Sequence, residues 1–157
     1  MRTLYRALLA VLASGLLLPG NVLAGEAEDA AALEHIIEAV RNGWLEADGD
    51  PFREHFLDFY GARYIESGGQ NEGLADLVEH HVEPEGHALA DFELNFSNPE
   101  IHLEGDFAWA IVDVDLEATV ISRDEKISRK GYETFLFRRT DGEWKVVHTH
   151  SSTRPKK

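Results

Sequence analysis

The segment that decides the fold is "GYETFLFRRTDGEWKVVHTHSS", residues 131–152. Two runs of alternating apolar and polar residues flank Asp141-Gly142, and this dipeptide favours a two-residue turn between antiparallel strands. The segment therefore predicts a β-hairpin near the C-terminus. Such a turn also sets the register, because it places Thr140 opposite Glu143 and every later pair follows from that one.

This register predicts a face of mixed character on the hairpin. It places Phe135 opposite His148 and Glu133 opposite His150, and strand alternation puts all four side chains on one face. A carboxylate opposite an imidazole accepts a hydrogen bond from it and favours its charged form. We therefore predict that His148 and His150 face a pocket together with Glu133. A three-residue loop with a bulge would instead bring Glu133 opposite Ser151.

The preceding sequence is helical first and extended later. Residues 31–46 have apolar side chains at the spacing of one helix face, and Asp50 followed by Pro51 is typical of the start of a second helix. From Asp91 onward, alternating residues predict antiparallel strands. Residues 107–121 form one long predicted strand whose apolar phase slips, which predicts a bulge and a bend inside it. The order predicts an α+β fold in which a curved sheet wraps around the helices and leaves a cavity.

A third helix is predicted for residues 72–82, "EGLADLVEHHV", closed by Pro84 and Gly86. His81 shares the apolar stripe of this helix with Leu77, so we expect its side chain to point toward the sheet.

The pocket candidates are therefore His81, Glu133, Phe135, His148 and His150. Imidazole and carboxyl groups together suit general acid–base chemistry, because histidine titrates near neutral pH. Two other interpretations stay open. The histidines can be interior residues with a structural role, or His148, His150 and Glu133 can bind a divalent metal ion, for which a His-x-His strand motif alone is a weak signal. We expect no cofactor.

The N-terminus has the layout of a secretory signal peptide. Arg2 and Arg6 are followed by an apolar stretch, Ala7–Leu18, of about a dozen residues, whereas a membrane-spanning helix needs roughly 20. Cleavage after Ala24 would leave one domain of residues 25–157. We therefore expect a signal peptide over residues 1–24 and a periplasmic or secreted protein, with no membrane contact after cleavage. An N-terminal membrane helix is the alternative.

The composition excludes several classes of site and partner. The chain has no cysteine, so disulfides, thiol catalysis and a lipid anchor on cysteine are excluded. Its formal net charge is −14, which repels phosphate backbones and anionic lipids. We expect no nucleic-acid partner.

Three stretches together resemble a known family: "GWLEADGDPF" (43–52), "LVEHHVEPE" (77–85) and the hairpin of residues 131–152. In these the chain is similar to the NTF2-like superfamily, in its SnoaL-like and ketosteroid-isomerase-like branch. The resemblance implies an α+β cone, with N-terminal helices packed on a strongly curved antiparallel sheet, a pocket open to solvent and frequent dimers. It does not imply one reaction, because the superfamily includes isomerases, dehydratases, cyclases and non-catalytic binding modules.

The sequence leaves open whether the protein is an enzyme. A ketosteroid-isomerase site needs an aspartate base with a tyrosine and a protonated acid, and no residues here can be matched to that trio. We expect a pocket that binds a small, largely hydrophobic molecule, with isomerase- or dehydratase-like acid–base chemistry as its catalytic form. The alternative is a non-catalytic dimeric accessory module with a vestigial pocket. A homodimer is expected through the opposite hairpin face, which carries Leu136 and Val147.

Overall fold

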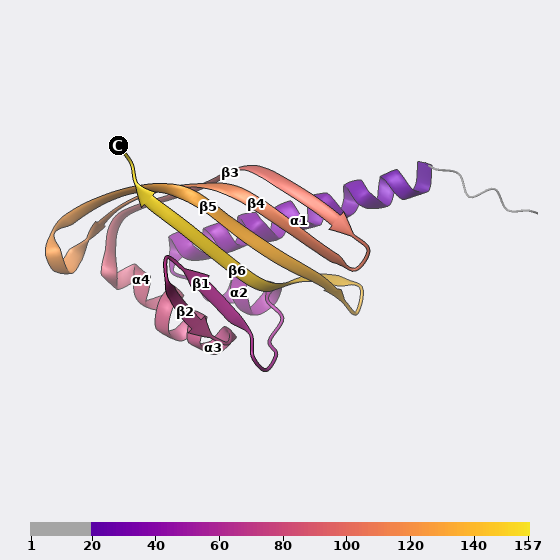
Figure 1. Cartoon of the computed structure of the whole chain (residues 1–157). Coiled ribbons are helices and arrows are strands. Elements are labelled where there is room, and N and C mark those ends of the chain that lie inside the picture. Colours follow the sequence, from indigo (N-terminus) through magenta and orange to yellow (C-terminus); the bar gives the residue numbers. More distant parts are fainter. Residues whose placement is uncertain (1–19) are drawn as a thin grey trace, which may run out of the picture.

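The structure, a computed structural model, describes the backbone of residues 20–157 and the side chains from Gly25 onward (Figure 1). Most of the expected signal peptide lies outside the described residues. The helices are α1 (Gly20–Glu46), α2 (Asp50–His55), α3 (Leu74–Leu77) and α4 (Glu83–Ala88). The strands are β1 (Arg63–Glu66), β2 (Gly69–Glu72), β3 (Leu89–Glu104), β4 (Phe107–Val120), β5 (Glu125–Thr140) and β6 (Glu143–Pro155).

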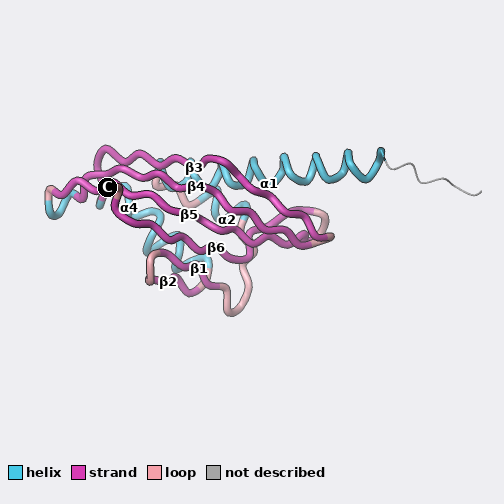
Figure 2. The backbone as a smooth tube through the Cα atoms, turned by 45° about the horizontal axis from the view of Figure 1, so that its top comes forward, coloured by secondary structure: helices cyan, strands magenta, loops and turns pink. Residues whose placement is uncertain are grey.

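The strands form one curled sheet in the order β2-β1-β6-β5-β4-β3. Every neighbouring pair is antiparallel except β1 with β6, which is parallel. The sheet does not close into a barrel, and the helices lie on its inner side (Figures 1 and 2). The predicted α+β fold with helices on a curved sheet is confirmed. Within residues 20–157, no helix has the length and apolar character needed to cross a membrane.

The core lies between α1 and the inner face of the sheet. The apolar stripe predicted for the first helix is buried, including Leu33, Ile36 and Val40. Small side chains on β4, Ala108 and Ala110, are fully buried as well. Alanines at these positions let helix and sheet pack closely.

Helix α1 is also joined to the tip of the β5–β6 hairpin by polar contacts. The carboxylate of Asp29 accepts hydrogen bonds from the Arg139 guanidinium and from Trp144 Nε1, the latter at 3.0 Å. The guanidinium lies 4.3 Å from the centre of the Trp144 ring, in the geometry of a cation–π contact. The hydrogen bond from Arg139 lowers the pKa of Asp29, so this carboxylate stays charged and the contact persists at neutral pH.

The predicted bulge in the long strand is wrong. β4 pairs with β5 in unbroken register, and its even-numbered residues point inward throughout. The phase slip has another cause: Phe107, Trp109 and Ile111 are bulky residues on the outer face, opposite the small inward alanines. The bulges of this half of the sheet lie in β3, where Asp91 and Asn98 have positive φ angles of 49° and 51°.

The hairpin has the predicted turn but not the predicted register beyond it. Asp141 and Gly142 have φ angles of 54° and 86°, as a two-residue turn of type I′ requires, and Thr140 lies opposite Glu143. Val147 is then left without a partner, because Val146 pairs with Phe137 and the next pair joins His148 to Leu136.

The extra residue at Val147 shifts the rest of the strand by one. Glu133 therefore lies opposite Ser151, and the predicted pair with His150 is wrong. The turn is not the cause, since it has two residues. The bulge turns His148 and His150 to the outer face and brings Thr149 inward.

Gly131 lies where the backbone of β6 comes close to β5. A Cβ atom built there would lie 1.9 Å from the carbonyl oxygen of Ser152. We expect Gly131→Ala to destabilise the protein by about 2 kcal/mol or more, because the two strands would have to separate. Denaturant unfolding measures this. Gly25→Ala is the control, since nothing lies within 4 Å of that position, and it should change stability by less than about 1 kcal/mol. Equal stability of both variants would contradict the close approach.

Candidate functional site

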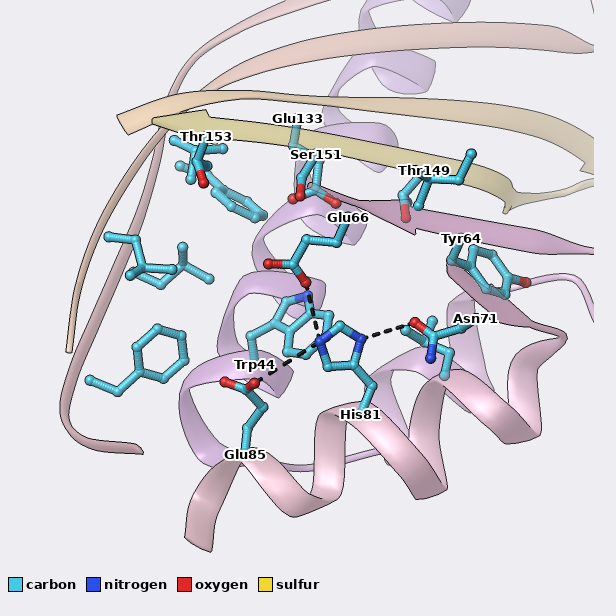
Figure 3. A pocket seen from close by; sticks show the side chains of 17 residues that line it. Trp44, Tyr64, Glu66, Asn71, His81, Glu85, Glu133, Thr149, Ser151 and Thr153 are labelled. Carbon is cyan, nitrogen blue, oxygen red and sulfur yellow. Dashed lines mark hydrogen bonds and ion pairs between the residues drawn. The ribbon is translucent and has the colours of Figure 1, made fainter. Parts of the chain in front are cut away.

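A pocket opens between the inner face of the sheet, α1 and the helical segment that precedes β3 (Figure 3). Its cavity volume is about 70 Å³, enough for several water molecules or a small organic group. Its lining combines aromatic and aliphatic walls with carboxyl, imidazole, amide and hydroxyl groups. The lining residues are Trp44, Tyr64, Ile65, Glu66, Asn71, Leu77, His81, Glu85, Phe92, Leu94, Phe96, Val114, Leu116, Glu133, Thr149, Ser151 and Thr153.

Two of the carboxyl groups come from one row across the sheet. Glu66 on β1 pairs with Ser151 on β6, and Ser151 pairs with Glu133 on β5. Neighbouring strands lie about 4.8 Å apart, so the backbones of the two glutamates are separated by about 10 Å with a serine between them. Both side chains point to the inner face, because paired residues share a face.

The imidazole of the site comes from an irregular helical turn. The predicted third helix does not end at Pro84, because α3 continues through a π-helical turn, Val78–Val82, into α4. The Glu83 N–H donates to the carbonyl oxygen of Val78, five residues back. Pro84 has no N–H to donate and its ring crowds the preceding turn, which accounts for a wider turn at this place. His81 then points into the pocket, as expected from the apolar stripe.

His81 lies between two hydrogen-bond acceptors. Its Nε2 is 3.2 Å from Glu66 Oε2 and its Nδ1 is 2.9 Å from Asn71 Oδ1 (Figure 3). Both ring nitrogens must carry hydrogen to satisfy both acceptors, which is the imidazolium form. The hydrogen bond with Glu66 raises the pKa of His81 against the opposing effect of burial, and the charge of Glu85, 4.0 Å from Nε2, adds to the increase. The Trp44 ring packs against the imidazole with 5.0 Å between ring centres.

Glu133 is a nearly buried carboxyl group of the pocket. Its side chain is only 8% exposed, and it has no hydrogen-bond partner among the described residues. Burial raises the pKa of Glu133 to about 8, and the charge of Glu66 contributes to the increase. Burial also raises the pKa of Glu85. At neutral pH, Glu133 therefore presents a protonated carboxyl group to the cavity, next to the hydrogen-bonded pair of Glu66 and His81.

The structure brings only part of the predicted candidate set together. Glu133 and His81 line the same pocket. Phe135 lies on the same face of β5 but is fully buried in the core. His148 and His150 lie on the outer face, so the prediction that they share a pocket with Glu133 is wrong. His148 Nδ1 is 2.7 Å from the carbonyl oxygen of Arg63, and His150 is exposed.

The metal alternative fails for the same reason, because Glu133 points away from the two strand histidines. Within residues 20–157, no group of three or more metal-binding side chains is arranged to hold an ion.

Three residues of the site were missed by sequence reasoning. Glu85 follows His81 by four residues, and helical spacing could have identified it as a neighbour. Glu66 and Asn71 offered no such signal, since they reach the site through the parallel pairing of β1 with β6. Short strands that pair at a distance leave no pattern in the sequence.

The charged pair can be tested by titration. We expect Glu66→Gln to lower the pKa of His81, because a neutral amide favours the imidazolium less than a carboxylate does. NMR titration of the histidine ring signals, assigned with a His81→Asn variant, measures it. Glu79→Gln removes an equal charge from the exposed side of the same helical segment and should leave His81 unchanged. Equal titration of His81 in all forms would contradict the contact.

Comparison with known proteins supports this architecture. An NTF2-like superfamily protein from Salmonella enterica serovar Typhimurium superposes with a TM-score of 0.72 at 19% identity, covering 85% of this chain and 94% of that one. A hexachlorocyclohexane dehydrochlorinase of LinA type 3 from Novosphingobium barchaimii gives a TM-score of 0.70 at 20% identity, covering 83% and 92%. At these identities the likeness shows the fold alone. A search of curated proteins finds no match. The family model of the SnoaL-like domain matches residues 30–155, and the chain therefore belongs to the SnoaL-like domain family.

Proposed function

We propose that this protein binds a small, largely hydrophobic molecule in the pocket and transfers a proton to or from it through Glu133. The observation that carries the proposal is the state of Glu133: a buried carboxyl, without a partner among the described residues, that faces a cavity. A purely structural carboxyl at this depth would be expected to have hydrogen-bond partners. Its pKa of about 8 is close to the value at which a general acid or base works best near neutral pH.

The other polar groups of the site support this role. Burial keeps the pKa of Glu133 high, and the charge of the neighbouring Glu66 adds to the increase. His81 holds Glu66 in place by donating a hydrogen bond to it. In its carboxylate form, Glu133 takes a proton from a carbon atom of the bound molecule and can return the same proton to another position. The apolar walls around it exclude water and strengthen these interactions.

The family supports the proposal at a coarser level. Members of this fold include isomerases and dehydrochlorinases, and one structural neighbour of this chain carries the name of a dehydrochlorinase. Both names describe reactions that involve removal of a proton. The reaction of this protein, however, must be established on its own pocket.

A neutral test compound suits this pocket. The ring opening of 5-nitrobenzisoxazole needs only a base that removes one proton from carbon: the N–O bond breaks and a coloured phenolate forms. We expect saturable ring opening whose rate rises with pH through about 8, as Glu133 loses its proton. Glu133→Gln should lower the rate by about a hundredfold or more. Absorbance of the phenolate measures it.

Two controls make the result specific. Glutamine resembles the protonated carboxyl of Glu133, so the variant should fold normally, and circular dichroism checks this. Glu100→Gln removes a charge from an exposed residue of β3 and should keep the full rate. A rate equal to the buffer background, or one that Glu133→Gln leaves unchanged, would refute proton transfer by this residue.

A second candidate function is a dimeric accessory module, favoured by the outer face of the sheet. One row of side chains crosses this face from β4 through β5 to β6, and it consists of Trp109, Leu136 and His148. Ile111 lies next to this row on β4. These side chains are partly exposed, and apolar residues on an open face favour burial against a partner. We propose that this partner is a second copy of the same chain. We also propose that the protein is exported, because its N-terminal sequence has the layout of a signal peptide.

Native mass spectrometry of protein recovered from the periplasm or medium tests both points. We expect a dimer of chains that begin at Gly25. Leu136→Glu places a charge in the middle of the apolar row and should yield monomers that remain folded. Monomers of the natural chain at micromolar concentration would contradict the dimer, and chains that retain residues 1–24 would contradict cleavage.

A further inference from the structure

The charges around the pocket are strongly unequal. Among the described residues that line it, three are glutamates and none is a lysine or arginine. His81 is the one basic group in that lining, and it is already paired with Glu66. Arg129 contacts one lining residue, Thr153, and its guanidinium donates to the hydroxyl and carbonyl oxygens of that residue at 2.8 and 2.9 Å.

An anionic ligand would meet no available positive charge in this cavity. Its carboxylate or phosphate would lie next to Glu66 and Glu85 and would lose its hydration without compensation. A neutral ligand could accept a hydrogen bond from the protonated Glu133. A cation does better, because it brings the missing partner for carboxyl groups that the fold holds in an apolar setting.

The walls of the pocket fit the rest of such a molecule. Phe92, Leu94 and Phe96 alternate along β3 with polar residues and line the cavity. The Trp44 ring lies beside the acidic groups, and aromatic rings attract cations. The pocket thus combines acidic groups with apolar walls.

We propose that the pocket takes a small hydrophobic amine in its protonated form, with the ammonium group next to Glu133 and the apolar body against Phe92 and Phe96. The inference rests on the proposed function in taking this cavity as the ligand site. It does not rest on proton transfer, since it concerns which molecules bind.

The same contact has a consequence for the proton of Glu133. An ammonium ion beside this carboxyl favours the charged form, so binding lowers its pKa and releases a proton to the solvent. The amine would thereby generate the carboxylate that the proposed reaction needs as its base. A neutral ligand of the same shape would leave the proton in place.

Three probes of nearly equal size separate these cases: benzylamine, benzyl alcohol and benzoate, which are cationic, neutral and anionic at neutral pH. We expect dissociation constants on the order of 1 mM for molecules this small. Benzylamine should bind at least about tenfold more tightly than benzyl alcohol, and benzoate most weakly. Isothermal titration calorimetry in buffers of different ionisation enthalpy measures affinity and proton release together. Up to one proton should leave per benzylamine bound, and none with benzyl alcohol.

Two variants connect the effect to the residue. Glu133→Gln should reduce benzylamine binding to the level of benzyl alcohol and abolish proton release, while the alcohol binds as before. Glu100→Gln removes an equal charge from the outer face and should change neither quantity. This control separates a contact in the pocket from general attraction of cations to an acidic protein.

The outcomes are distinct from those of the proton-transfer assay. Tighter binding of benzyl alcohol or benzoate than of benzylamine, or no binding of any probe at about 10 mM, would overturn the preference for an amine. Equal affinity of the natural protein and of the Glu133→Gln variant for benzylamine would also overturn it. If ring opening of the neutral substrate still depends on Glu133, the proposed function stands while the inference fails. If the protein binds benzylamine through Glu133 but does not open the ring of the neutral substrate, the preference for an amine stands and the proposed proton transfer fails.

Discussion

One extra residue in β6 determines which side chains reach the pocket. Before Val147 the inward residues of this strand are Trp144 and Val146, which belong to the core. After it they are Thr149 and Ser151, which line the cavity. The bulge thus places hydroxyl groups rather than imidazoles on the inner face at the level where core ends and pocket begins, and it aligns Ser151 with Glu66 and Glu133.

Burial of acidic groups beside this row has an effect on stability as well as on chemistry. The pKa of Glu133 is raised in the folded protein, so its contribution to stability is complete below its ordinary value of 4.5 and is lost as pH rises through about 8. His81 acts in the same direction, because its raised pKa stabilises the fold below 6.5 and that contribution also disappears at higher pH. Both groups therefore favour the folded protein more in mild acid than above neutral pH.

The sequence allowed the outline of this fold to be predicted but not the alignment that makes the site. Asp141-Gly142 identified the hairpin because few dipeptides adopt two positive φ angles, and the stripe containing His81 followed from helical periodicity. The bulge at Val147 has no local sequence signal, since valine is common in regular strands. One unforeseen residue was enough to move His148 and His150 out of the predicted site.

The attachment of β1 has a consequence for how the site comes apart. This strand pairs with β6 at three positions, Tyr64, Ile65 and Glu66, and β2 beyond it is an edge strand. Glu66 and Asn71, the two acceptors of His81, both belong to this small appendage. Edge segments with few pairings open far more often than the centre of a sheet. Fraying of this short two-stranded ribbon would thus remove both acceptors of the imidazole and one of the three glutamates of the pocket at once, while Glu133 remained in place on an intact β5.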